Sequence, residues 1–221
     1  MPGKKKGLRW QEAGSLADTA EAAIRTPVLA ARYSGDMEGL LRALRSNIPL
    51  THRDPFIAGQ SIAFGMIVWG LINGHRLGDV SRAVINKAGQ GSVPATLEVP
   101  DRSGTLEVSF TDALLQPSWS HEAARDPAVQ IDPPLAACRL FGLACSLSFL
   151  LPAAYYFASR FENDFYQAVM SPLNGGGNNM ARAALTGALA GAQVGLSGIP
   201  EYLIKGLSDH ERLLQMAEDI T

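Results

Sequence analysis

Apolar residues recur at helical spacing along most of this chain. Leu40, Leu41 and Leu44 fall on one side of a helix over residues 36–46. Residues 55–73 are apolar on every side, which is typical of a helix buried in a core. The pattern predicts an all-α protein with helices over residues 15–25, 36–46, 55–73, 77–88, 135–157, 161–170 and 208–219.

Several residues predict where these helices begin and end. Ser15 is the expected N-cap of the first helix, and Pro27 is expected to bend or start the next piece. Asp54 or Thr51 is expected to cap the long apolar helix, and Gly74 suits its end.

The pattern changes between residues 92 and 110. The triplet LEV occurs twice there, around the turn-forming PDRSG, which predicts a short β-hairpin or an ordered loop near residues 95–110. Residues 116–134 are rich in Pro, Asp and Ser and are expected to form a loop with one helical turn. We find no linker in the rest of the chain, so we predict one domain over residues 15–221, preceded by a flexible tail over residues 1–14.

Residues 172–200, PLNGGGNNMARAALTGALAGAQVGLSGIP, join a glycine-rich loop to a helix of small residues. The three glycines at 175–177 can take positive φ angles that other residues avoid, so the loop can bend sharply. Asn178 or Asn179 is expected to cap the helix by accepting a hydrogen bond from a free amide.

Three glycines of this helix, Gly187, Gly191 and Gly195, fall four residues apart on one face. Each costs about 1 kcal/mol of helix stability relative to alanine. Their register predicts that another helix backbone approaches closely at this face.

Residues 140–159 carry no charge and meet the length rule for a membrane-spanning helix. Pro152 interrupts the run, and Arg139 and Arg160 bracket it closely. We therefore expect a buried helix and no membrane contact. No apolar run follows Met1, so we expect no signal peptide.

The composition limits the partners and the cellular compartment that we expect for this protein. The chain has 221 residues, of which 47% are hydrophobic, and a net charge of −2, which gives no general attraction to nucleic acid. Residues 4–6 are lysines and are expected to be a solvated terminus. Cys138 and Cys145 lie seven residues apart, about 10 Å on one helix, which is too far for a disulfide. Two buried, inert thiols in a reducing, cytoplasmic setting are expected.

The residues that can carry chemistry form few recognised patterns. None of the four histidines has the spacing of a zinc site, and we find no nucleophile elbow. The glycine loop can present free amides to a phosphate, but it lacks the Lys-Ser/Thr ending of a P-loop. His52 and Asp54, in LTHRDP, form either an acid–base pair or, as is commoner, a turn that caps and packs locally.

Two long stretches resemble a known family. FENDFYQAVMSPLNGGGNNMARAALTGALAGAQVGLSGIP is similar to the C-terminal half of the ADP-ribosylglycohydrolase superfamily, where a glycine-rich loop precedes a GALAGA helix. AAIRTPVLA resembles its Arg-x-x-Pro segment, and LTHRDPFIAGQSIAFGMIVWGLING resembles its Thr-His helix. The resemblance implies an all-α, orthogonal helical bundle.

The resemblance also implies where metal ligands belong. Catalytic members hold two magnesium ions between an N-terminal Thr-Asp-Asp cluster and an Asp-x-Asp-Thr/Ser in the glycine loop. By the GALAGA spacing these loop ligands fall on Asn178, Met180 and Ala181. A thioether and a methyl group do not bind the hard Mg²⁺ ion. The N-terminal cluster has no counterpart before AAIRTP, so we expect no metal and no cofactor.

The sequence NNMARAALTGALAGAQVGL resembles the J crystallins and selenoprotein J more than it resembles the catalytic members. This branch of the superfamily is largely structural. We therefore expect a non-catalytic structural or ligand-binding protein. The alternative is a hydrolase of ADP-ribosyl bonds completed by a missing N-terminal half or a partner chain. A third hypothesis is a metal-independent enzyme that uses His52, Asp54 and Asn178.

The candidate ligand is ADP-ribose-like, and an incomplete bundle is expected to form a homodimer or to bind a complementing chain. The residues expected to contact the ligand are Asn174, Gly176, Gly177, Asn178, Asn179, His52 and Asp54.

Overall fold

The computed structural model describes residues 13–89, 96–101 and 104–220. The helices are α1 (Glu21–Arg32), α2 (Met37–Asn47), α3 (Pro55–Ile72), α4 (Leu77–Gly89), α5 (Gln116–Arg125), α6 (Ala137–Phe141), α7 (Leu147–Arg160), α8 (Phe165–Asn174), α9 (Asn179–Val194), α10 (Glu201–Lys205) and α11 (His210–Ile220). The strands are β1 (Thr96–Asp101) and β2 (Gly104–Ser109). The described residues also include the short 3-10 turns η3 (Ile48–Leu50), η4 (Asp112–Leu115), η5 (Pro134–Ala136) and η6 (Leu196–Gly198).

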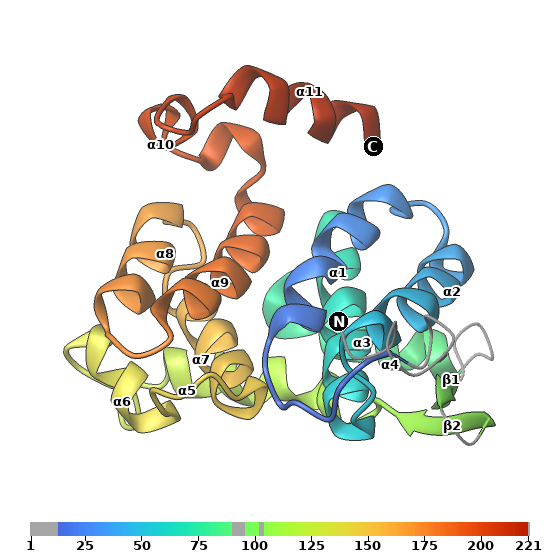
Figure 1. The fold of residues 1–221 in the computed structure, drawn as a ribbon. Helices are drawn as coiled ribbons and strands as arrows, with labels where there is room; N and C mark the ends of the chain where they lie inside the picture. Colours follow the sequence, from blue (N-terminus) through green and yellow to red (C-terminus); the bar gives the residue numbers. More distant parts are fainter. Residues whose placement is uncertain (1–12, 90–95, 102–103, 221) are drawn as a thin grey trace.

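The helices form an all-α bundle, as predicted. Figure 1 shows α1 to α4 and the hairpin on one side, α5 to α9 on the other, and α10 and α11 above them. The helix α3 packs against α1, α4, α9 and β2, and α7 packs against α5, α8 and α9. The helices predicted over residues 36–46, 55–73, 77–88 and 208–219 are confirmed to within about two residues, and α8 begins four residues later than predicted.

The centre of the bundle is α3. Every residue from Ile57 to Leu71 is buried, because other elements cover all of its faces. Asp54 caps its start by accepting from the amides of Phe56 and Ile57, and Gly74 follows its end with a φ of 84°. Both features were predicted.

By length and composition alone, α3 is apolar enough to cross a membrane, and 83% of it is buried inside the protein. Helices in the core of soluble proteins pass the same test.

The helix α1 begins later and runs further than predicted. Residues before it are extended, and Ser15 pairs with His52 in a β-bridge instead of capping a helix. Pro27 lies inside α1 and has no amide to donate to Ala23. The hydroxyl of the buried Thr26 donates to that carbonyl at 2.9 Å, so the helix continues through the proline.

The prediction of a single helix over residues 135–157 is wrong. The chain breaks after α6 at Gly142, whose φ of 119° is not helical, and resumes at Leu147. The break leaves Cys138 buried and Cys145 exposed, so the prediction of two buried thiols holds for Cys138 alone.

The expected close approach at the glycines of α9 is also wrong. A Cβ added at Gly187 or Gly191 would make ordinary contacts of 3.6 or 3.8 Å with α8, and Gly195 ends the helix with a φ of 67°. The close approach occurs at α3, where a Cβ on Gly59 would collide with the carbonyl oxygen of Ser109 and one on Gly70 with Val80.

The middle of the chain holds the predicted hairpin and one further helix. β1 and β2 pair antiparallel, and Val99 and Val108 are buried in the core cluster that includes α3. Residues 116–125 form the ten-residue helix α5, so the prediction of one helical turn there was too short. A proline near its start and its packing against α7 favour the helix.

The predicted tail over residues 1–14 and the three lysines at 4–6 fall almost entirely outside the described residues. Gly14 belongs to the body of the protein, because it is buried and its carbonyl accepts from Nε of Arg53 at 3.0 Å.

We predict that Thr26→Val destabilises the protein by about 1–3 kcal/mol, because it leaves the buried Ala23 carbonyl without a donor. Ser46→Ala is the matched control, since the exposed Ser46 hydroxyl also donates to a helical carbonyl, that of Arg42. Urea unfolding of the two variants measures the difference. Equal losses would contradict the role assigned to Thr26.

Candidate functional site

The glycine loop between α8 and α9 has the sharp bend that the sequence predicts at two of its three glycines. Gly176 and Gly177 have φ angles of 79° and 66°. Gly175 has a φ of −75°, so backbone freedom is not why glycine is needed there. A Cβ at Gly175 would overlap the sulfur of Cys138, so this position needs glycine for space.

Two asparagines fix the end of the loop. The Asn178 side chain accepts from the Ala181 amide at 3.4 Å and caps α9, as predicted. The Asn178 amide donates to the Leu143 carbonyl at 2.9 Å. The Asn179 side chain donates to the Leu173 carbonyl at 2.9 Å. The loop is therefore held against both α8 and the segment between α6 and α7.

Beneath the loop lies Arg182, which is fully buried in the first turns of α9. Its Nη1 donates to the carbonyls of Gly176 at 3.0 Å and Pro172 at 3.4 Å, and its Nη2 donates to Gly142 at 3.0 Å. Within the described residues, Arg182 has no carboxylate in ion-pair contact and its Nε has no hydrogen-bond partner. A buried positive charge thus ties the end of α8 and the glycine loop to the segment after α6, which lies 40 residues away from Arg182 in sequence.

Cys138 lies beside this guanidinium. Its Sγ is 3.9 Å from the Pro172 carbonyl oxygen, which also accepts from Arg182. Burial raises the pKa of the Cys138 thiol, and the nearby positive charge opposes this shift without overcoming it. Cys138 is therefore a protonated packing residue rather than a nucleophile.

A second group of polar side chains surrounds His52, which is 3% exposed. Its Nε2 lies 3.0 Å from the Thr19 hydroxyl and 3.4 Å from Glu21 Oε2, and its Nδ1 lies 2.9 Å from the Thr51 hydroxyl. The Thr19 hydroxyl also donates to the Glu21 carboxylate.

The two titratable groups of this cluster both have lowered pKa values. Burial lowers the pKa of His52, and the charge of Glu21 opposes that shift only in part. The hydrogen bond from Thr19 is the largest cause that lowers the pKa of Glu21. The cluster therefore holds a neutral imidazole beside an ionised carboxylate near neutral pH.

The structure gives His52 and Asp54 different partners. His52 faces Thr19 and Glu21, whereas Asp54 accepts from the backbone amides at the start of α3. This arrangement matches local capping and packing, the commoner of the two interpretations considered for LTHRDP. The sequence did not point to Thr19 or Glu21 as neighbours of His52.

One segment connects the histidine cluster to the glycine loop. Thr19 forms an isolated β-bridge with Ser146, and the Leu147 amide donates to the Asp18 carbonyl at 2.7 Å. The same segment supplies the Leu143 carbonyl to Asn178. These contacts therefore join four separate stretches of the chain near the first turns of α1 and α9, namely residues 18–21, 51–52, 143–147 and 178.

Of the predicted ligand contacts, Asn174 lines a cavity. This cavity has a volume of about 340 Å³ and is bounded by Leu135 and by Tyr166, Met170 and Ser171 of α8. Gly176 and Gly177 instead form the bend, and Asn178 and Asn179 hold its end.

The loop residues do not fit a magnesium site. The Asn178 oxygen already accepts from Ala181, and the thioether of Met180, which is 73% exposed, is a soft ligand. Ala181 offers no side-chain ligand. Among the described residues, no three His, Cys, Asp or Glu side chains are grouped closely enough to hold a metal ion.

We predict that Arg182→Met destabilises the protein by about 2–4 kcal/mol, since three carbonyls lose a charged donor. Arg212→Met on the exposed face of α11 is the control and should change stability by less than about 0.5 kcal/mol. Urea unfolding measures both.

Should Arg182→Met fail to fold, Arg182→Lys provides a milder test. Lysine keeps the positive charge but cannot reproduce the fork, meaning the hydrogen bonds that Nη1 and Nη2 of Arg182 donate in two directions. Amide hydrogen exchange at Gly177 and Asn178 should therefore accelerate. Unchanged exchange would contradict the role of the fork.

Folding stability should also fall as the pH is lowered from 7 to 5.5. The ordinary pKa of His52 is 6.5 and its folded value is lower, so the unfolded chain binds more protons in this range and is stabilised relative to the folded chain. Glu21 acts in the same direction at lower pH, below its ordinary 4.5. His52→Gln should flatten the profile between pH 7 and 5.5 relative to the unmodified chain. A profile equally steep in His52→Gln and in the unmodified chain would refute this assignment.

Two comparisons with known proteins bear on this site. No curated protein matches the chain at a significant level. The family model described as ADP-ribosylglycohydrolase matches residues 3–221, which is nearly the whole sequence. With its helical bundle and its glycine loop at the start of α9, the chain belongs to the ADP-ribosylglycohydrolase family.

Proposed function

We propose that this chain is a family member that does not use a two-magnesium mechanism and acts as a non-catalytic structural or ligand-binding protein. One observation carries the proposal. The guanidinium of Arg182 holds the glycine loop from inside the protein, and Arg182 lies within about one helical turn of all the positions that the resemblance assigns to metal ligands. The loop is thus ordered by a cation that belongs to the chain.

Electrostatics oppose a second cation at this place. A divalent ion and a guanidinium about 6 Å apart repel each other by roughly 5 kcal/mol at an effective dielectric constant of about 20. The resemblance places aspartates at the loop positions of catalytic members, but here the corresponding positions are Asn178, Met180 and Ala181. A metal at this loop would meet repulsion and gain few ligands.

The same charge favours an anionic ligand. The N-terminus of α9 and the buried Arg182 both contribute positive potential near the loop. An ADP-ribose-like ligand carries a diphosphate that such a potential attracts. The proposed binding therefore needs no metal.

The resemblance of NNMARAALTGALAGAQVGL to the J crystallins and selenoprotein J agrees with a structural role. A reactive residue like the selenocysteine of that branch is not evident here. Cys138 is buried with a raised pKa, and Cys145 is exposed.

The alternative function is hydrolysis of ADP-ribosyl glycosidic bonds, with the acidic ligands supplied by another chain. The carboxylate of Glu21 favours it, because this side chain is 65% exposed and lies beside Thr19 at the junction with Ser146. Association is part of either proposal. Leu213 and Met216 of α11 are 47% and 52% exposed and are available to a second copy or a complementing chain.

We predict that isothermal titration with ADP-ribose gives the same result in excess Mg²⁺ and in excess EDTA, because the positive potential of the α9 N-terminus and of the buried Arg182 is present without a metal. The metal-free arm is the control within the same protein. Binding that appears only with Mg²⁺ would contradict the proposal.

Release of ADP-ribose from modified protein separates the two functions. The proposed function predicts no release by this chain, alone or mixed with a candidate complementing chain. Release that depends on the second chain and on Mg²⁺ would establish the alternative.

A further inference from the structure

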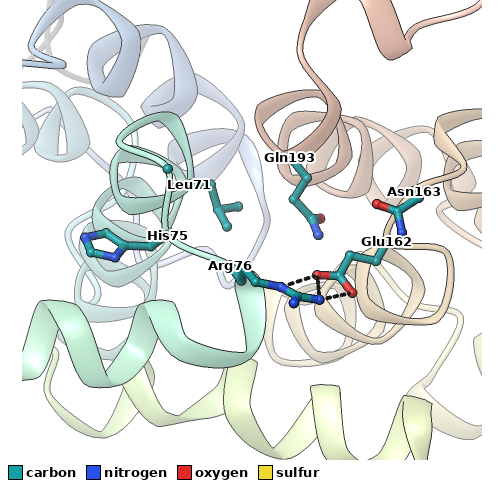
Figure 2. Close-up of a pocket in the computed structure, with 7 residues that line it drawn as sticks. Leu71, His75, Arg76, Glu162, Asn163 and Gln193 are labelled. Atoms are coloured by element: carbon teal, nitrogen blue, oxygen red, sulfur yellow. Dashed lines mark hydrogen bonds and ion pairs between the residues drawn. The ribbon is translucent and has the colours of Figure 1, made fainter.

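A second polar site lies at the far end of α9 from the glycine loop. A cavity of about 210 Å³ opens between the end of α3, the turn that leads into α4, the turn between α7 and α8, and the last turn of α9. Gln193 lines it, fifteen residues or about 22 Å along the helix from Asn178. Figure 2 shows the Gln193 carboxamide directed toward Glu162.

The carboxamide of Gln193 is unsatisfied. Its Oε1 and Nε2 are both buried, and neither has a hydrogen-bond partner among the described residues. Leaving such groups unpaired costs about 1–3 kcal/mol each, and buried polar atoms in native proteins are rarely left without a partner. The Gln193 carboxamide therefore presents an adjacent unpaired donor, Nε2, and acceptor, Oε1, at the cavity.

The wall opposite Gln193 is rigid and charged. Arg76 donates from Nε and Nη2 to Glu162 at 3.1–3.3 Å, and Arg125 donates to the same carboxylate at 3.1 Å. The Glu162 side chain is 9% exposed, so two guanidinium groups hold it in place. Figure 2 shows the pair formed by Arg76 and Glu162 among the residues that line the cavity.

The remaining features limit the size and shape of a ligand. Leu71, which is buried, supplies an apolar wall on the α3 side. The volume equals about seven waters at roughly 30 Å³ each, which suits a single ring with its substituents. A flat ring can pack against Leu71 while its edge faces Gln193.

We propose that this cavity binds a small planar ligand that presents an adjacent hydrogen-bond donor and acceptor to Gln193. A nucleobase edge and a primary carboxamide share this chemistry, and glutamine pairs with adenine in the same two-bond manner in nucleic-acid recognition. The site is independent of the glycine loop, of metal and of the proposed function.

Ligand-observed NMR titration of the full chain with adenine and with benzamide tests the proposal. A ligand of this size is expected to bind with a dissociation constant on the order of 1 mM or tighter. Purine, which lacks the exocyclic amine, is the matched probe and should bind at least tenfold more weakly than adenine. Adenine binding without benzamide binding would identify a nucleobase site, and the reverse would identify a carboxamide site.

Gln193→Leu keeps the size of the side chain and removes both polar atoms. It should weaken binding at least tenfold, and its melting temperature should be unchanged or higher, because an unpaired amide is lost from the buried wall. Gln215→Leu, on exposed α11, is the control and should bind as the unmodified chain does. Failure of both probes to bind, or equal binding by Gln193→Leu, would overturn the proposal.

Discussion

The fork of hydrogen bonds from Arg182 is the interaction on which the functional end of this protein depends. It joins the end of α8, the glycine loop and the segment after α6 through the carbonyls of Pro172, Gly176 and Gly142. A guanidinium without a carboxylate is costly to bury, so its donors must be used well. The bend at Gly176 and Gly177 turns the Gly176 carbonyl toward the charge.

The hydrogen bonds of Arg182 also affect the region around the start of α1. Once the segment after α6 is fixed, its bridge from Ser146 to Thr19 places the start of α1 near the loop. The His52 cluster then lies in the same region, with a neutral imidazole and an ionised Glu21. The core helix α3 supports both parts, because α1 and α9 pack against it.

Much of the fold could be predicted from local pattern, because burial of α2, α3 and α4 follows from their apolar spacing. Asp54 and Asn178 were recognisable as caps, since capping needs only the neighbouring amides. The failures have tertiary causes. The continuation of α1 through Pro27 depends on the hydrogen bond from the Thr26 hydroxyl to the Ala23 carbonyl. The break at Gly142 allows its carbonyl to accept a hydrogen bond from Arg182. An arginine among small residues is typical of an exposed position, and its neighbours in sequence do not reveal that the distant Gly142 carbonyl joins those of Pro172 and Gly176 around it.

Anomalous diffraction from crystals soaked in Mn²⁺, which substitutes for Mg²⁺ at oxygen ligands, tests whether the glycine loop holds a metal ion or is held by Arg182 without one. We expect no anomalous peak beside residues 178–182 and an Arg182 side chain still bonded to Gly142 and Gly176. A six-coordinate ion at this loop, with Arg182 displaced from those carbonyls, would contradict this expectation.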